Sequence, residues 1–163
     1  MRFLQLIVSI LAFIAAMPAL GASDPRVADM TLCRESWLDW KKNDPAALES
    51  FGAFLRTAFS PEESDGSLEP KTDTAIDGLK ITRVFPGSVG MGLGFSVIVD
   101  VPFDVARQAL ELDVGKRLGH CQASDGMRSC ELPITEQRTI MLVSGDAPNG
   151  RTTLAGCYYY YEK

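Results

Sequence analysis

The sequence predicts an α+β fold, in which an N-terminal helical segment and one inserted helix pack on a curved, mostly antiparallel β-sheet reinforced by two disulfides. Three observations lead to this prediction. Apolar residues recur at helical spacing before residue 60, and alternation typical of strands dominates after residue 75. The 163-residue chain also holds four cysteines, an even number that fits two disulfides.

The first 21 residues have the three parts of a cleavable signal peptide. Arg2 supplies the positive end, residues 3–17 form an apolar run, and small residues precede the candidate cleavage point. The run is shorter than the roughly 20 apolar residues of a membrane span. We therefore expect residues 1–21 to be removed and residues 22–163 to form a single exported α+β domain without a stable membrane anchor.

The charge of the chain restricts the class of partner. The whole chain has a formal net charge of −5, and loss of Arg2 with the signal peptide leaves 15 basic and 21 acidic residues, a net charge of −6. A nucleic-acid-binding surface needs a concentration of basic residues, and anionic lipid also attracts basic segments. The acidic balance therefore argues against nucleic acid and against an anionic membrane, and it is compatible with a basic protein partner.

The segment before residue 60 predicts two short helices, or one helix interrupted at Pro45. The first helix carries an apolar stripe formed by Met30, Cys33, Trp37 and Trp40. Asp44 is suited to cap the second helix, because Pro45 then occupies its first turn, where a missing N–H has no cost. Phe51 and Leu55 share the apolar face of this second helix, so we expect both helices to pack on the core.

Residues 60–74 form an acidic segment with two prolines between the helical part and the sheet. Its simplest interpretation is a solvated loop, because polar residues with proline favour exposed connections. The functional interpretation is an acidic finger, formed by Glu62, Glu63 and Asp65, that meets a cationic partner.

The strand-like part begins near residue 75, with a first strand at 79–82 and the clearest strand at 89–101. In an extended chain, the second of these places bulky apolar residues on one side and small residues on the other. The small side holds Ser88, Gly90, Gly92, Gly94 and Ser96. Such glycines indicate either a bend that wraps the sheet over a helix or a shallow groove in which a partner lies on bare backbone.

A helix is expected after Pro102, followed by two late strands at 139–144 and 152–161. The last strand contains four consecutive tyrosines, so alternate rings point to opposite faces of the sheet. One pair is expected in the core and the other on the surface, where aromatic side chains favour binding. We assign the exposed role to Tyr159 and Tyr161.

Residues 121–130 predict a β-hairpin with its own disulfide. An Asp-Gly pair at its centre tolerates the positive φ angles of a two-residue turn. Counting outward from this turn places Cys121 directly opposite Cys130 in a non-hydrogen-bonded pair, where side chains come closest together. By elimination, Cys33 and Cys157 form the second bridge, between the first helix and the last strand.

The motifs predict no catalytic residue, no metal ligand and no cofactor. His120 is the only histidine, and it adjoins a cysteine expected in a disulfide, so a nucleophile–histidine pair has no evident members. The cysteines lack the Cys-x-x-Cys spacing of zinc sites, and the glycines after Val89 lack the spacing of a nucleotide-binding loop. Carboxylates are the main candidates left for hydrolytic chemistry.

These features predict an exported, non-enzymatic protein that binds another macromolecule in the cell envelope, in a periplasm or outside the cell. An inhibitor or immunity-type protein directed against a basic hydrolase fits the charge, the size and the disulfides. The alternatives are a carrier of a small apolar ligand and a hydrolase that uses unrecognised carboxylates. The candidate binding surface comprises Tyr159, Tyr161, Gly90, Gly92, Gly94, Glu62, Glu63 and Asp65.

Overall fold

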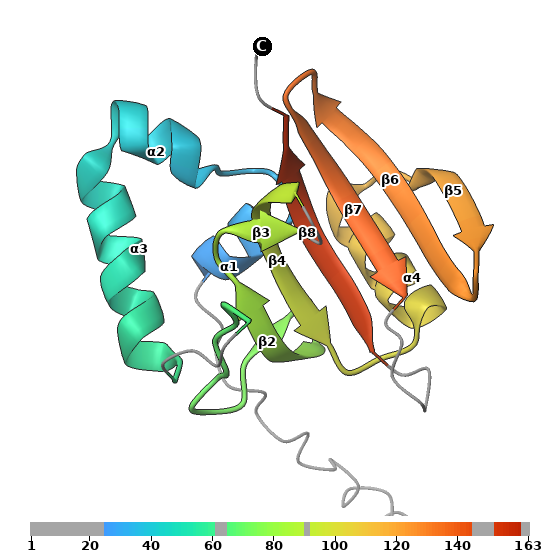
Figure 1. The fold of residues 1–163 in the computed structure, drawn as a ribbon, viewed down its shortest axis with the longest axis horizontal. Helices are drawn as coiled ribbons and strands as arrows, with labels where there is room; N and C mark the ends of the chain where they lie inside the picture. The colour runs from blue at the N-terminus through green and yellow to red at the C-terminus, as the bar shows by residue number, and fades with distance from the viewer. Residues whose placement is uncertain (1–24, 61–64, 90–91, 145–151, 161–163) are drawn as a thin grey trace, which may run out of the picture.

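The computed structural model describes residues 25–60, 65–89, 92–144 and 152–160, and it confirms the predicted α+β fold (Figure 1). Within these residues, four helices accompany an antiparallel sheet of eight strands. The helices are α1 (Pro25–Thr31), α2 (Trp37–Asn43), α3 (Pro45–Ala58) and α4 (Phe103–Val114). The strands are β1 (Ala75–Ile76), β2 (Leu79–Phe85), β3 (Ser88–Val89), β4 (Gly92–Val99), β5 (Gly119–Ser124), β6 (Met127–Thr135), β7 (Arg138–Ser144) and β8 (Thr153–Tyr159).

The order of the strands brings distant parts of the chain together. The sheet follows the order β1-β2-β4-β8-β7-β6-β5, with β3 paired to β4, and all these pairs are antiparallel. The late strand β8 therefore lies in the middle of the sheet, hydrogen-bonded to β4 on one side and to β7 on the other. This insertion places the tyrosines of β8 beside the glycines of β4.

The N-terminal part contains three described helices rather than the predicted two. α1 ends two residues before Cys33, whose backbone is left-handed with φ of 57°, so the apolar stripe expected on one helix is divided between two. Ser36 then begins α2, and its side chain accepts a hydrogen bond from the Leu38 N–H at 3.2 Å. The break allows Cys33 to reach the sheet, where it is bonded to Cys157.

The interruption predicted at Pro45 is confirmed. The Asp44 carboxylate accepts a hydrogen bond from the Ala47 N–H at 3.0 Å, and Pro45 occupies the first turn of α3. From α3, the ring of Phe51 lies 5.8 Å from that of Phe95 in β4, measured between centroids. The aromatic face of α3 thus connects this helix to the sheet.

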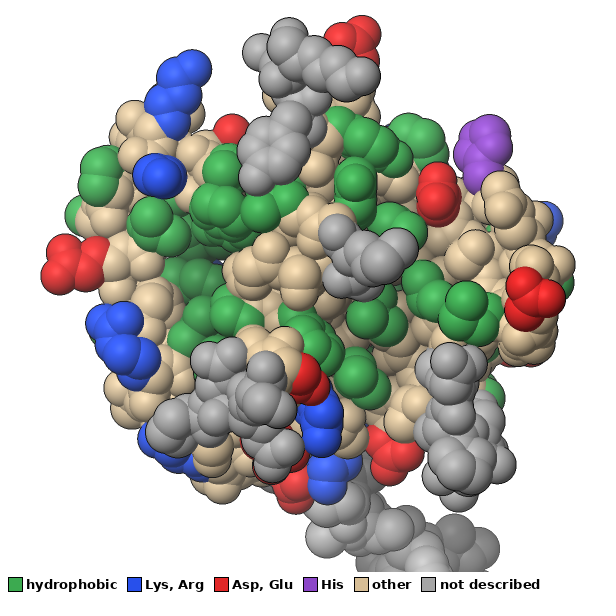
Figure 2. Space-filling model, viewed as in Figure 1, with side chains coloured by type: hydrophobic (Ala, Val, Ile, Leu, Met, Phe, Trp, Pro, Cys, Tyr) green, Lys and Arg blue, Asp and Glu red, His purple; other side chains and the backbone are tan. Residues whose placement is uncertain are grey.

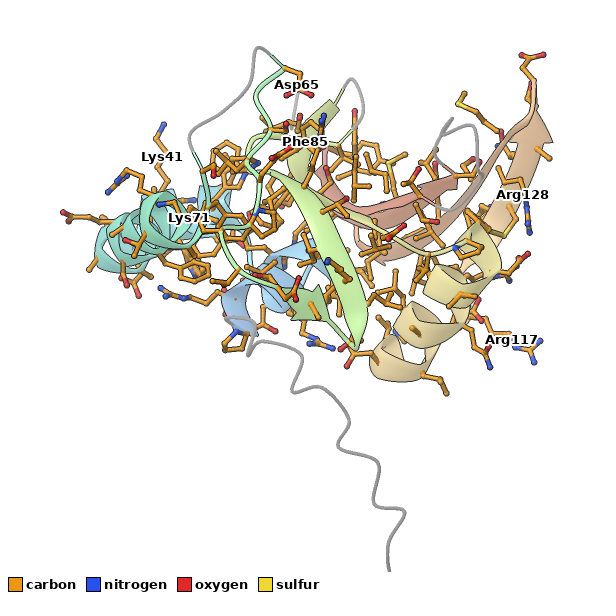
Figure 3. The ribbon with its side chains drawn as sticks, turned by 90° about the horizontal axis from the view of Figure 1, so that it is seen from below. Lys41, Asp65, Lys71, Phe85, Arg117 and Arg128 are labelled. Carbon is orange, nitrogen blue, oxygen red and sulfur yellow. A yellow bond between two sulfur atoms is a disulfide. The ribbon has the colours of Figure 1, made fainter. Side chains whose placement is uncertain are left out.

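α1 and α4 lie on the same side of the sheet (Figures 1 and 3). The strand residues that face these helices are fully buried, including Phe95, Val97 and Val99 in β4 and Ile140 and Leu142 in β7. Burial of apolar surface contributes roughly 25 cal/mol per Å². This layer therefore provides the main attachment between the helices and the sheet.

The strand predicted over 89–101 is instead a hairpin of two strands, β3 and β4. Val89 pairs with Gly92 in an antiparallel register, so the chain reverses direction between them. The alternation of apolar residues continues across this reversal, which is why the sequence pattern alone indicated one strand. As a result, the Val89 side chain lies over Gly94 rather than further along a straight strand.

Both predicted disulfides are present. One joins Cys33, after α1, to Cys157 in β8, and the other joins Cys121 in β5 to Cys130 in β6. The first spans 124 positions of sequence and the second spans 9. The first therefore fixes the helical part to the centre of the sheet, whereas the second closes a single hairpin.

The Asp-Gly turn of the β5–β6 hairpin is confirmed, with φ angles of 52° and 82° at its two central residues. The predicted register extends from this turn to Gln122 and then shifts between Gly119 and Gln122. His120 within the shifted part has a left-handed backbone, with φ of 45°. Cys121 is therefore bonded to Cys130 from an irregular part of β5, where their Cα atoms are 4.1 Å apart.

Candidate functional site

Helices cover one face of the sheet, whereas none of the described helices covers the other. Among the described residues, no helix packs on the side opposite α1 and α4 (Figure 3). Figure 2 shows this opposite side, where hydrophobic side chains gather near the centre and most charged side chains lie toward the periphery. The sheet also bends, so that its β5–β6 end rises on the side away from α4 (Figure 3).

Five half-buried apolar side chains form the centre of this side, which we call the open face. They are Phe85 in β2, Ile98 in β4, Met141 and Val143 in β7, and Leu154 in β8. Ile98 pairs with Leu154, which pairs with Val143, so these three form a row across neighbouring strands. Antiparallel sheets commonly have a polar second face. An apolar row here is therefore a feature that needs a functional explanation.

Small residues lie in the next row of the open face. Ser96 and Gly156 pair with each other between Phe85 and Met141. Ser96 is fully buried, and its hydroxyl donates a hydrogen bond to the Ser88 carbonyl at 2.8 Å. A Cβ at Gly156 would lie 2.5 Å from that of Ser96. The row therefore has its bulky side chains at its two ends.

The prediction that Tyr159 is exposed is wrong. Tyr159 is only 2% exposed, because it points to the helix side and packs against Trp37 with ring centroids 5.9 Å apart. The rings of Tyr158 and Tyr160 are 4.8 Å apart in an edge-to-face arrangement, and Tyr160 is 46% exposed. Strand alternation predicted that Tyr158 and Tyr159 face opposite sides of the sheet, but helix packing decides which of these sides is buried. Tyr161 lies outside the described residues.

A hollow of about 370 Å³ lies beside these tyrosines, where α2 meets the start of β7. Tyr159, Tyr160, Arg138 and Asp39 are among its lining residues. Arg138 and Asp39 form an ion pair at 3.5 Å. Burial raises the pKa of Tyr159 to about 12, so its hydroxyl is neutral at physiological pH. These two opposite charges thus neutralise each other beside a neutral phenol.

The described glycines of the predicted glycine stripe are covered rather than bare. A Cβ at Gly92 would lie 1.7 Å from a carbon of the Tyr158 ring, and a Cβ at Gly94 would lie 2.1 Å from the Cys157 carbonyl oxygen. Both glycines therefore permit a close approach of neighbouring groups in this chain. No groove of bare backbone is formed at these two positions, and Gly90 lies outside the described residues.

Of the predicted acidic finger, Asp65 is described, whereas Glu62 and Glu63 lie outside the described residues. The Asp65 carboxylate accepts hydrogen bonds from the hydroxyl and the N–H of Ser67, at 2.6 and 2.9 Å, and pairs with Arg83 at 3.2 Å. The Ser67 hydrogen bonds hold the pKa of Asp65 below its ordinary value. This carboxylate is therefore a fixed negative charge beside β2.

The β2 end of the open face has more negative than positive charge. Arg83 approaches Glu69 at 3.8 Å in addition to Asp65, so that two carboxylates accompany one guanidinium. Asp65 and Phe85 lie on the same side of the sheet, away from α4 (Figure 3). At the other end, Glu131 pairs with Met141 of the open face and adds a further carboxylate.

Potential metal ligands do not cluster anywhere in the described residues. These residues contain no group of three or more His, Cys, Asp or Glu side chains that could hold a metal ion. His120 is exposed in the irregular part of β5. No helix in the described ranges is both long enough and apolar enough to cross a membrane. The candidate site that these residues offer is the open face, because its apolar side chains form a row across neighbouring strands.

Sequence reasoning missed the apolar residues of the open face, although a signal for them was present. Ile140, Met141, Leu142 and Val143 are apolar at four successive positions. In a strand, such a run places apolar side chains on both faces of the sheet. Because the described helices cover one face alone, the run could have indicated an apolar surface on the other.

Comparison of the chain with protein-family models, with curated proteins and with solved structures finds no match.

Proposed function

We propose that this chain is an exported binding protein that docks a protein partner on its open face. The observation that carries the proposal is the row of Ile98, Leu154 and Val143, three half-buried apolar side chains on a sheet face that no described helix covers. Phe85 and Met141 lie at the two ends of the neighbouring row on the same face and add to this apolar surface. Contiguous apolar side chains at a protein surface mark interaction sites.

The charges around the open face support a partner with an apolar centre and a basic rim. Asp65 and Glu69 outnumber Arg83 at the β2 end, and Glu131 lies beside Met141 at the β6 end. The whole chain also carries a net charge of −5. Complementary rim charges speed the encounter of two proteins and discourage partners of the wrong sign.

The disulfides support export as the setting for this binding. Two disulfides indicate an oxidising compartment, because cytosolic thiols are kept reduced. The signal peptide predicted at residues 1–21 would supply the route. Within that setting, we propose a periplasmic or extracellular role as an inhibitor or immunity-type protein against a basic hydrolase.

The open face favours a protein partner over a small apolar ligand. Polar and charged side chains predominate in the lining of the hollows of about 320, 360 and 370 Å³ that described residues border. Ligand-binding cavities for apolar molecules are lined predominantly by hydrophobic side chains. Among the described residues, the apolar side chains grouped in the centre of the open face instead lie on an open sheet.

The test places a photo-crosslinking residue at position 154 or at position 112, in protein expressed in its native host. Leu112 on α4 is the matched control, because it is 77% exposed on the helix-covered side. We expect a partner to be crosslinked from position 154 and not from position 112. Leu154→Lys should then weaken the affinity for that partner by about tenfold or more, whereas Leu112→Lys should leave it unchanged. Equal crosslinking from both positions, or equal affinities of the two lysine variants, contradicts the proposal.

A further inference from the structure

The two disulfides differ in their access to solvent. Cys33 and Cys157 are 1% and 0% exposed, between α1 and the sheet. Cys130 is also buried, at 1% exposed, but its partner Cys121 is an exposed residue. The Cys121–Cys130 bond is therefore accessible from one of its two ends.

The strand that carries Cys121 is weakly attached to the rest of the fold. None of the six residues of β5 is buried, and β5 is hydrogen-bonded only to β6. We call residues 119–130 the arm. Movement of β5 away from β6 exposes little apolar surface, so it requires much less free energy than global unfolding. In contrast, β8 is paired on both sides, and Cys157 lies at its centre.

We propose that the Cys121–Cys130 bond is a thiol-exchange site, and that Cys33–Cys157 is a permanent structural bond. The site accepts a small thiol such as glutathione, or the active-site dithiol of an oxidoreductase. This assignment is independent of the binding function of the open face, because it rests on the arm alone. It gives the arm two states, one closed by the disulfide and one in which β5 is released from β6.

The exchange proceeds by displacement at sulfur. The incoming thiolate bonds to Cys121 Sγ, the bond to Cys130 breaks, and Cys130 leaves as a thiolate that takes a proton from water. The products are a mixed disulfide at Cys121 and a thiol at Cys130. With a dithiol, the second thiolate then displaces Cys121. The dithiol is oxidised by two electrons, and the protein disulfide is reduced to two thiols.

The geometry points to Cys121 as the sulfur that is attacked. A thiolate approaches a disulfide from the side opposite the sulfur that leaves, so attack at Cys121 comes from the exposed side of β5. Attack at Cys130 would require an approach from the buried side, where Cys130 pairs with Leu142, a residue that is 0% exposed. The mixed disulfide is therefore expected on Cys121 and not on Cys130.

The experiment exposes the folded, oxidised protein to reduced glutathione, blocks free thiols with iodoacetamide and maps the tryptic peptides. Each cysteine falls in its own tryptic peptide, namely 27–34, 118–128, 129–138 and 152–163. We expect glutathione on peptide 118–128 and the iodoacetamide label on peptide 129–138. Peptides 27–34 and 152–163 should remain linked, with reduction at least about tenfold slower. Glutathione on peptide 129–138, equal reduction of both bonds, or no adduct at all overturns the proposal.

A matched variant separates the arm from the core. The double variant Cys121→Ser with Cys130→Ser retains the Cys33–Cys157 bond and every buried residue of the core except Cys130. We expect it to fold, as judged by its near-ultraviolet circular dichroism, and to take up no glutathione. Uptake of glutathione by the folded double variant would show that Cys33–Cys157 exchanges as well, which would also overturn the assignment.

Discussion

The centre of the sheet and its β5–β6 end each contain a disulfide and glycines, but these are buried at the centre and more exposed at the β5–β6 end. At the centre, β8 is hydrogen-bonded on both sides, and its disulfide joins two buried cysteines. At the β5–β6 end, β5 is hydrogen-bonded on one side, and its disulfide joins an exposed cysteine to a buried one. Glycines differ in the same way, because Gly94 is enclosed by neighbouring atoms, whereas a Cβ added at Gly119 would meet no atom within 4 Å.

Burial, rather than residue type, determines what a disulfide or a glycine contributes to stability. A disulfide in the core links elements that are distant in sequence, and the residues packed around it stay in place when the surface fluctuates. A disulfide in the arm links two neighbouring strands, so its loss directly releases one hairpin.

Removal of the buried disulfide should have the largest effect on stability. Cys33→Ala with Cys157→Ala releases a link across 124 positions, and the chain-entropy model gives a loss of roughly 4–5 kcal/mol. The matched change, Cys121→Ala with Cys130→Ala, releases a link across 9 positions and should cost roughly 2–3 kcal/mol. Urea unfolding of both variants measures the two free energies. A larger loss from the arm disulfide would reverse the proposed contrast.

Substitution of a central glycine should have the next largest effect. A Cβ at Gly94 would lie 2.1 Å from a carbonyl oxygen of β8, so Gly94→Ala must separate two paired strands. We expect a loss of about 2–3 kcal/mol in the free energy of unfolding. The Cβ that Gly119→Ala adds in the arm points into open space, so this substitution should change the free energy of unfolding by less than about 0.5 kcal/mol. Similar effects of the two substitutions in thermal unfolding would contradict the contrast.

The sequence was sufficient for the local features of both regions. The turn of the β5–β6 hairpin follows from its Asp-Gly pair, and the start of α3 follows from Asp44 and Pro45, because these residues satisfy or constrain the backbone next to them. Both disulfide pairings followed from the hairpin, since it placed Cys121 near Cys130 and the two remaining cysteines could then pair only with each other. Each of these predictions depended on residues close together in sequence.

Features that depend on packing between distant segments could not be predicted in this way. Alternation in β8 showed that Tyr158 and Tyr159 face opposite sides, but only the position of α1 and α2 decides which side is the core. The open face escaped prediction for the same reason, because Ile98 and Leu154 are ordinary strand residues until the helices are known to cover only the other face. The β3–β4 reversal was missed because its apolar alternation continues through it.

High pH should destabilise the core through Tyr159. Burial raises the pKa of Tyr159 to about 12, above the ordinary value of 10.0. The stability that depends on the neutral phenol is complete below pH 10 and is lost as the pH rises toward 12, because the unfolded chain ionises first. Between pH 9 and pH 11, the free energy of unfolding should therefore fall by about 1–1.5 kcal/mol less in Tyr159→Phe than in the parent protein. Tyr160, which is exposed, is the control, and Tyr160→Phe should follow the parent protein in urea unfolding.

The smallest effect on global stability is expected from the contact that holds the arm to α4. Arg128 donates two hydrogen bonds to the Asp104 carboxylate, at 2.7 and 2.9 Å, and its guanidinium lies 4.5 Å from the centre of the Phe103 ring. Both charged groups are exposed, so Arg128→Gln should leave the melting temperature nearly unchanged. It should instead lower the hydrogen-exchange protection of the amides in residues 119–130, because the arm moves away from α4 more often.

The pH dependence of this contact distinguishes the ion pair from simple packing against Phe103. The hydrogen bonds from Arg128 lower the pKa of Asp104. The stabilisation of the arm is therefore complete above the ordinary carboxyl pKa of about 4 and is lost as the pH falls through the lowered pKa. Arm protection, corrected for the intrinsic exchange rate, should fall over that range in the parent protein and stay constant in Asp104→Asn. If the two proteins show the same pH dependence, the arm is held by the Phe103 contact and not by the ion pair.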